Sequence, residues 1–168
     1  AIQPVQSWGN LCAGQLMVAL PFALMNGIMM HNNYLLLALF VLIWVNDSGA
    51  YIVGSLTAKL PKGNHKMFPR VSPAKSWEGL VGGILFSLLA GYIFFRVGWT
   101  AEMGLLNSLL FACAGSIFGT LGDLMESLFK RTLGVKDSGK IMPGHGGVLD
   151  RFDSLLLAIP VVYLLFVY

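Results

Sequence analysis

The chain has 168 residues, of which 56% are hydrophobic and only 11% are charged, and its formal net charge is +3. Soluble domains carry roughly 25% charged residues, so a chain with less than half that share cannot cover a soluble surface of this size. The composition therefore excludes an ordinary soluble domain and predicts an integral membrane protein that forms one compact unit.

Five apolar stretches follow one another along the chain, over residues 11–30, 35–58, 76–98, 105–129 and 148–168. Each is long enough to cross about 30 Å of hydrocarbon as a helix. Helices are the expected form because backbone groups in lipid must bond within their own segment. The runs are continuously apolar rather than alternating, which excludes a barrel. We therefore predict an all-α, multispanning transmembrane helical bundle with about five spans.

Lysine and arginine residues gather in two segments, 59–75 and 130–151, and two predicted spans separate these segments. Both segments should therefore emerge on the same side of the membrane. The short connections at 31–33 and 98–104 contain no lysine or arginine. Because basic loops tend to stay in the cytoplasm, we expect the two basic segments to face it.

Asp47 lies inside the second apolar stretch, far from either end. A bare carboxylate at that depth costs a few kcal/mol, so we expect it to face the protein interior or a wet cavity and to meet a cation. Tyr51 follows one helical turn later on the same face. Two other interpretations stay open at this point: a hydrogen bond between helices, and an ion path through a transporter or channel.

A second polar group ends the fourth apolar stretch. Asp123, Glu126, Ser127 and Lys130 stand at positions i, i+3, i+4 and i+7, so they share one stripe of a helix. Two acids, a hydroxyl and a lysine on one stripe predict a wet groove rather than a lipid-facing surface. An internal ion pair between Glu126 and Lys130 could account for part of the pattern.

The segment 136–154 combines glycines, lysines and aspartates. Glycines let backbone N–H groups approach an anion closely. Asp150 and Asp153 lie one turn apart at the start of the last apolar stretch, so both could face one cation. Carboxylates are the natural ligands of hard cations such as Mg²⁺. A flexible loop with charged ends is the alternative interpretation.

The segment 66–79 leads into the third apolar stretch, and Ser76 is the expected N-cap of that helix. Arg70 and Lys75 could hold phosphate groups. Taken alone, a solvated basic loop explains this segment equally well.

The pattern S-x2-K-R-x4-K-D-S-G-x3-P-G-H-G-G-x2-D-R-x-D, over residues 127–153, resembles the signature of CDP-diacylglycerol synthases (phosphatidate cytidylyltransferases). Residues 47–51 and 72–79 are similar to upstream motifs of the same family. The resemblance implies an enzyme that condenses CTP with phosphatidic acid to CDP-diacylglycerol and pyrophosphate in phospholipid biosynthesis. It further implies a Mg²⁺ requirement, with a second cation such as K⁺ left open, and a site that faces the cytoplasm from a bacterial-type inner (plasma) membrane.

The resemblance also implies roles for individual residues. The expected metal ligands are Asp123, Asp150 and Asp153. The expected catalytic residues are these three together with Lys130, Arg131 and Lys136. The expected substrate-binding residues are Asp47, Tyr51, Arg70, Ser72, Lys75, Glu126, Ser127, His145, Gly146, Gly147 and Arg151.

On this interpretation the chain is one membrane domain in two parts. Residues 1–75 supply two transmembrane helices and a basic cytoplasmic loop, and residues 76–168 supply a three-helix catalytic region with the signature at 127–153. The partners are CTP, phosphatidic acid and the bilayer, with no nucleic acid, and a homodimer is left open. A related lipid or polyprenol kinase is the alternative enzyme, and an ion or lipid transporter is the alternative that is not an enzyme.

Overall fold

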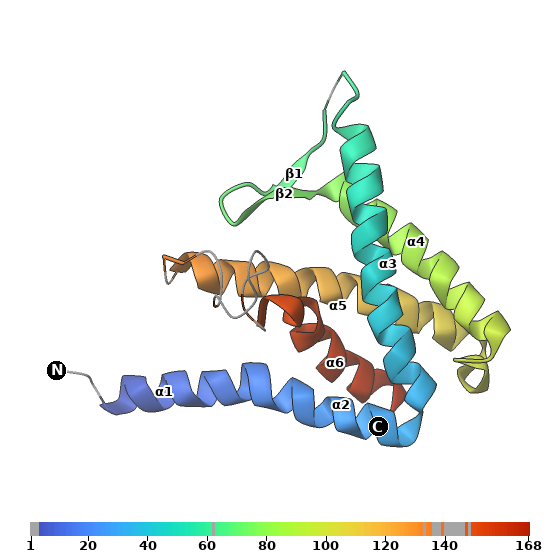
Figure 1. Ribbon diagram of the computed structural model, residues 1–168, viewed down its shortest axis with the longest axis horizontal. Coiled ribbons are helices and arrows are strands. Elements are labelled where there is room, and N and C mark those ends of the chain that lie inside the picture. Colours follow the sequence, from blue (N-terminus) through green and yellow to red (C-terminus); the bar gives the residue numbers. More distant parts are fainter. Residues whose placement is uncertain (1–3, 62, 133, 136–138, 140–146, 148) are drawn as a thin grey trace.

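The computed structural model describes residues 4–61, 63–132, 134–135, 139, 147 and 149–168 (Figure 1). The predicted all-α class is confirmed: helices account for almost all regular structure in the described part of the chain. The helices are α1 (Pro4–Gly14), a π-helical stretch (Gln15–Ala19), α2 (Leu20–His31), α3 (Asn33–Thr57), α4 (Trp77–Val97), a short 3-10 turn (Ala101–Met103), α5 (Gly104–Thr132), a second 3-10 turn (Leu149–Arg151) and α6 (Asp153–Phe166).

Four helical segments in the described residues are long and apolar enough to cross a membrane: Leu11–His31, Asn33–Thr57, Trp77–Val97 and Ala101–Thr132. They correspond to the first four predicted spans. The fifth predicted stretch, 148–168, forms the shorter helix α6 of 14 residues, whereas a perpendicular crossing needs about 20. The bundle therefore has four candidate spans, and α6 packs against them as an additional apolar helix.

The basic segment between α3 and α4 contains a small antiparallel hairpin that the sequence did not predict. Strand β1 (Lys66–Phe68) pairs with β2 (Ser72–Ser76), with Lys66 opposite Ser76 and Phe68 opposite Ser72. The expected N-cap is confirmed, because Ser76 Oγ accepts a hydrogen bond of 3.1 Å from the backbone N–H of Gly79. Strand β2 therefore leads directly into α4 without a connecting loop.

Helices α3 and α4 pack closely because α4 presents glycines to α3. A Cβ atom at Gly83 would come within 2.5 Å of Asn46 Oδ1, and one at Gly79 within 3.0 Å of the carbonyl oxygen of Ala50. A side chain at either position would therefore require the Asn46 side chain or the α3 main chain to shift. This contact places the polar end of α3 beside the start of α4.

The buried apolar core lies at the end of the bundle opposite the hairpin. It joins the end of α2 and the first half of α3 to the end of α4, the first half of α5 and most of α6. Ile28, Leu39, Phe111 and Ile159 are among its members, each no more than 2% exposed. Toward the other end, α3 and α5 run in different directions, and the hairpin extends from the α3–α4 pair over the C-terminal half of α5 (Figure 1).

Candidate functional site

Two adjoining cavities lie where the helices diverge. The first has a volume of about 260 Å³, and its wall includes Asn46, Asp47, Ala50 and Tyr51 of α3, Met67, Ala74, Lys75 and Ser76 of the hairpin, Gly79 and Leu80 of α4, and Thr120 and Asp123 of α5. The second has a volume of about 430 Å³ and is lined by Phe40, Ile43, Trp44, Asp47, Asp123, Asp150, Arg151, Phe152, Asp153, Ser154 and Leu155. Asp47 and Asp123 belong to both walls, so the two cavities adjoin at these carboxylates, and the two together are called the cleft below.

Lys75 and Asp123 form an ion pair across the first cavity. Lys75 Nζ lies 2.6 Å from Asp123 Oδ2 and also donates a 3.3 Å hydrogen bond to the main-chain oxygen of Thr120. The Lys75 side chain is 21% exposed and that of Asp123 is 31% exposed. Ser127 Oγ donates to the second carboxylate oxygen of Asp123 at 3.3 Å. The pair therefore connects the hairpin to α5 and balances the charge of Asp123 within the protein.

Beneath the first cavity, a polar contact joins α3 to α5. Asn46 is only 2% exposed, and its Oδ1 accepts a 2.5 Å hydrogen bond from Ser116 Oγ. Its Nδ2 lies 3.4 Å from Thr120 Oγ1 and 3.5 Å from Asp47 Oδ1. Because a buried amide without partners is costly, this contact fixes the depth at which α3 crosses α5.

Asp47 itself faces the cleft, as its depth in an apolar helix predicted. The expected cation is Lys75, which lines the same cavity and acts on Asp47 through its charge without forming a described ion pair with it, while Asn46 donates a hydrogen bond to the Asp47 carboxylate.

Lys130 joins the end of α5 to the start of α6. Its Nζ lies 2.6 Å from Glu126 Oε2 and 2.7 Å from Asp150 Oδ1. The second carboxylate oxygen of Asp150 accepts a 2.6 Å hydrogen bond from the backbone N–H of Gly147. The internal pair of Glu126 and Lys130, which the sequence left open as an alternative explanation of part of the polar stripe, is therefore present. Glu126 is only 4% exposed, so its carboxylate serves Lys130 rather than lining either described cavity.

Asp153 completes the acidic side of the second cavity at the first residue of α6. Its Oδ1 accepts hydrogen bonds from Ser154, at 2.6 Å from the backbone N–H and 3.2 Å from the hydroxyl. Burial, with the negative charge of Asp123 adding to it, raises the pKa of the Asp153 carboxyl to about 6. A cation placed among these acids would relieve both effects.

Four aspartates line the second cavity: Asp47, Asp123, Asp150 and Asp153. Carboxylate oxygens are the ligands that Mg²⁺ takes, so the donor chemistry fits a hard divalent cation. However, no group of three or more His, Cys, Asp or Glu residues in the described part of the chain has the arrangement of a metal site. The metal ligands therefore stay a prediction. What the structure does bring together is Asp123 and Asp150 on one cavity wall, each beside a lysine.

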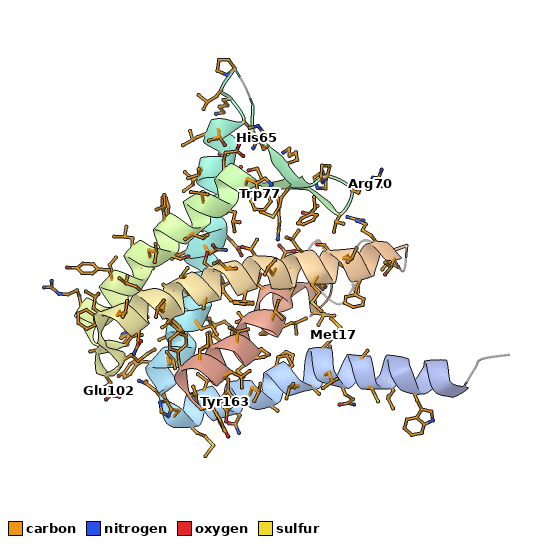
Figure 2. The ribbon with its side chains drawn as sticks, turned by 180° about the vertical axis from the view of Figure 1, so that it is seen from behind. Met17, His65, Arg70, Trp77, Glu102 and Tyr163 are labelled. Atoms are coloured by element: carbon orange, nitrogen blue, oxygen red, sulfur yellow. The ribbon has the colours of Figure 1, made fainter. Side chains whose placement is uncertain are left out.

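The other expected site residues are placed as follows. Tyr51 lines the first cavity and Arg151 the second. Arg70, in the turn of the hairpin, and Ser72, on β2, line neither described cavity, and Arg70 points away from the base of the hairpin, where His65 lies (Figure 2). Arg131 is exposed in the last turn of α5. Lys136, His145 and Gly146 lie outside the described residues.

Asn46 and Thr120 belong to the cleft and were not expected from the sequence. The sequence position of each residue could have indicated a place in the site. Asn46 stands next to Asp47 inside an apolar helix, and Thr120 precedes Asp123 by three residues on the same helical face. Neither position stood out because a single polar residue in a membrane helix usually serves helix packing.

Together, the fold and this cleft define a multispanning α-helical membrane protein whose charged groups collect where the spans diverge. The chain belongs to the cytidylyltransferase family, whose model matches residues 5–168.

Curated relatives point the same way. The chain is 47% identical over 136 residues to a protein of Staphylococcus haemolyticus named phosphatidate cytidylyltransferase, and the match covers 80% of this chain and 49% of that protein. A Haemophilus influenzae protein of the same name is 44% identical over 133 residues, covering 77% of this chain and 44% of the relative. A Staphylococcus aureus protein of that name is 42% identical over 136 residues. The chain thus spans about half the length of the curated relatives it matches.

Proposed function

We propose that the protein is a phosphatidate cytidylyltransferase, which transfers CMP from CTP to phosphatidic acid and gives CDP-diacylglycerol and pyrophosphate. The observation that carries the proposal is the cleft whose acids Asp123 and Asp150 form ion pairs with Lys75 of the hairpin and Lys130 of α5, respectively. The family membership and the names of the relatives agree with it.

The proposed reaction is a nucleotidyl transfer. A phosphate oxygen of phosphatidate attacks the α-phosphorus of CTP and forms a new P–O bond. The bond from the α-phosphorus to the oxygen that bridges to the β-phosphorus breaks, and its electron pair leaves with pyrophosphate. A phosphate monoester is largely ionised at neutral pH, since its second pKa is about 6, so no strong general base is needed.

Both substrates are polyanions, so the site must offset their repulsion before they can meet. Lys75 and Lys130 form ion pairs with acids of the cleft, and Arg151 lines the second cavity. The two lysines can exchange a carboxylate for a substrate phosphate oxygen. A bound Mg²⁺, held by Asp123, Asp150 and Asp153, would supply further charge neutralisation at the phosphates. Positioning and electrostatics then account for most of the rate.

The position of the cleft suits a substrate that lies in a membrane. Lys59, Lys66 and Arg70 lie near the same end of the molecule as the cleft, which by the distribution of basic residues is the cytoplasmic end. The second cavity adds apolar side chains, including Phe40 and Trp44 of α3, to its four aspartates. A bacterial-type inner membrane location, a second cation such as K⁺ and a homodimer belong to the same proposal.

The test uses the complete gene product that contains this chain, purified in detergent and given phosphatidate, Mg²⁺ and CTP labelled at either the α- or the γ-phosphate. We expect lipid-soluble label from α-labelled CTP only, together with release of pyrophosphate. Label in lipid from γ-labelled CTP would instead identify a lipid kinase. Flux of ions into liposomes in the absence of CTP, with no label in lipid, would identify a transporter.

A further inference from the structure

We propose that Glu78, which is not among the expected site residues, is a positioning residue for the transfer reaction. Its carboxylate closes the base of the β1–β2 hairpin and thereby holds Lys75 in place against Asp123. The inference rests on the proposed function for its role in the reaction, but the contact itself can be tested without any turnover.

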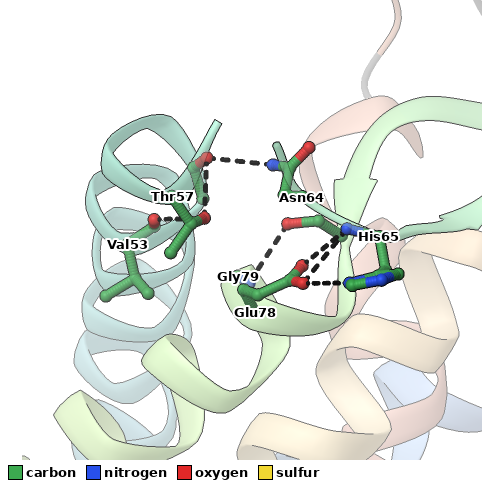
Figure 3. Close-up of polar contacts among 8 residues, drawn as sticks. Val53, Thr57, Asn64, His65, Glu78 and Gly79 are labelled. Carbon is green, nitrogen blue, oxygen red and sulfur yellow. Dashed lines mark hydrogen bonds and ion pairs between the residues drawn. The ribbon is translucent and has the colours of Figure 1, made fainter. Parts of the chain in front are cut away.

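Glu78 makes its contacts with the residue that precedes β1 (Figure 3). Its two carboxylate oxygens accept hydrogen bonds of 3.1 and 3.0 Å from the backbone N–H of His65. The ring Nδ1 of His65 lies 2.7 Å from Glu78 Oε1. A single side chain in the first turn of α4 thus binds both the main chain and the ring of His65.

Two further hydrogen bonds close the same base. The backbone N–H of Trp77 donates to the carbonyl oxygen of His65 at 3.0 Å. Asn64 Nδ2 donates to the carbonyl oxygen of Gly54, near the end of α3, also at 3.0 Å. The hairpin is therefore fastened at one place to both α3 and α4, and its turn at Arg70 extends away from that place (Figure 2).

The position of Lys75 depends on these hydrogen bonds at the hairpin base because the hairpin forms one wall of the cleft. Met67 of β1 and Ala74, Lys75 and Ser76 of β2 all line the first cavity. Lys75 lies only two residues before Trp77, so the register of the hairpin base sets where its side chain begins. From there its Nζ reaches Asp123 and Thr120 of α5.

Ser76 already caps α4, so the cap of the helix does not require the contacts of Glu78 with His65. An acid in the first turn of a helix is favourable in its own right. The experiment must therefore separate an effect on Lys75 from a general effect on the helix.

The first measurement is a double-mutant cycle in the complete gene product, with Glu78→Ala, Lys75→Ala and the double variant assayed for CMP transfer. We expect Glu78→Ala to lower kcat by about 10- to 100-fold, the range expected for a misplaced catalytic group, with a smaller change in KM for CTP. Glu78→Gln keeps an oxygen for the His65 N–H and should recover part of the loss. In the Lys75→Ala background, Glu78→Ala should cause no further loss.

The second measurement reads the hairpin without turnover, by trypsin cleavage in detergent. Cleavage after Lys66, in β1, is compared with cleavage after Lys59, which lies outside the hairpin. We expect Glu78→Ala to raise this ratio severalfold. Arg96→Ala is the matched control, because it removes a charged side chain that donates to Tyr92 at the opposite end of α4, and it should leave both the kinetics and the ratio as in the wild type.

An unchanged trypsin ratio in Glu78→Ala would overturn the inference, and so would a loss that multiplies in full with that of Lys75→Ala. If the wild type transfers no CMP, the proposed function fails. The trypsin ratio then decides alone whether Glu78 holds the hairpin.

Discussion

At the scale of single residues, the main feature of the cleft is that two lysines already form ion pairs with some of its acids, while the acids stay in excess. Lys75 pairs with Asp123, and Lys130 pairs with Glu126 and Asp150. A partly buried charge without a partner is unfavourable, so these pairs lower the free-energy cost of holding charged side chains in a cleft near the membrane. On the proposed function, each lysine would exchange a carboxylate partner for a phosphate oxygen when the substrate binds.

Lys75 and Arg70 should differ as substrate contacts. We expect Lys75→Ala to lower kcat/KM for CTP by about 100-fold, because it removes a charged hydrogen-bond donor from the cavity wall. Arg70→Ala should have a smaller effect, since Arg70 lies in the exposed turn of the hairpin. Initial rates over a range of CTP concentrations measure both. Equal losses in the two variants would contradict the placement of Lys75.

Asp150 should be essential for the chemistry. We expect Asp150→Asn to lower CMP transfer by at least about 100-fold, because the neutral amide leaves Lys130 with Glu126 alone and takes one carboxylate from the acidic cavity. Rates at saturating Mg²⁺, with circular dichroism of the same samples, test it.

The matched control is Glu102→Gln, in the exposed turn before α5 at the opposite end of the bundle, which should keep wild-type rates. Near-wild-type turnover of Asp150→Asn would remove this carboxylate from the proposed site.

At the scale of elements, the close contact of α3 and α4 determines the shape of the cleft. Helix α4 turns its glycines toward Asn46 and Ala50, so these two helices act as one unit that carries Asp47 and the hairpin. Helix α5 carries Thr120 and Asp123 on the other side. The cleft therefore lies between a rigid helix pair and a third helix.

Gly83→Ala should separate the helix pair. Its Cβ would come within 2.5 Å of Asn46 Oδ1, so we expect a loss of about 1–3 kcal/mol in the free energy of unfolding. Thermal unfolding in a single detergent measures the change. Gly9→Ala in α1 is the matched control, because a Cβ there meets nothing within 4 Å. An unaltered melting temperature for Gly83→Ala would show that α3 can move aside.

The sequence predicted those elements and contacts that depend on local patterns. Long apolar runs indicate helices, and spacing on one helical face correctly grouped Glu126 with Lys130. The hairpin was not predicted because its strands have only 3 and 5 residues and show no alternating apolar pattern. The ion pair of Lys75 and Asp123 was not predicted either, because residues so far apart in sequence meet only through the packing of α3, α4 and α5.

At the scale of the whole molecule, the two ends of the bundle should lie on opposite sides of the membrane. After replacement of Cys12 and Cys113, we expect a single cysteine introduced at Lys59 to react with a membrane-impermeant reagent only from the cytoplasmic side. A cysteine at Glu102 should react only from the opposite side, because a single span, α4, separates the hairpin end from the turn before α5. Labelling of both positions from one side would contradict the orientation.

The well-packed core lies at the end of the bundle that contains none of the expected site residues. The cleft lies at the other end, where α3, α5 and the hairpin diverge. We therefore expect the core end of the bundle to be more rigid than the end that holds the cleft. Regions with few buried apolar contacts open before the rest of a protein does. Gentle warming should accordingly abolish the proposed CMP transfer at a temperature where most of the helical circular-dichroism signal persists. Ligands that bridge the cleft should bring these two transition temperatures closer together.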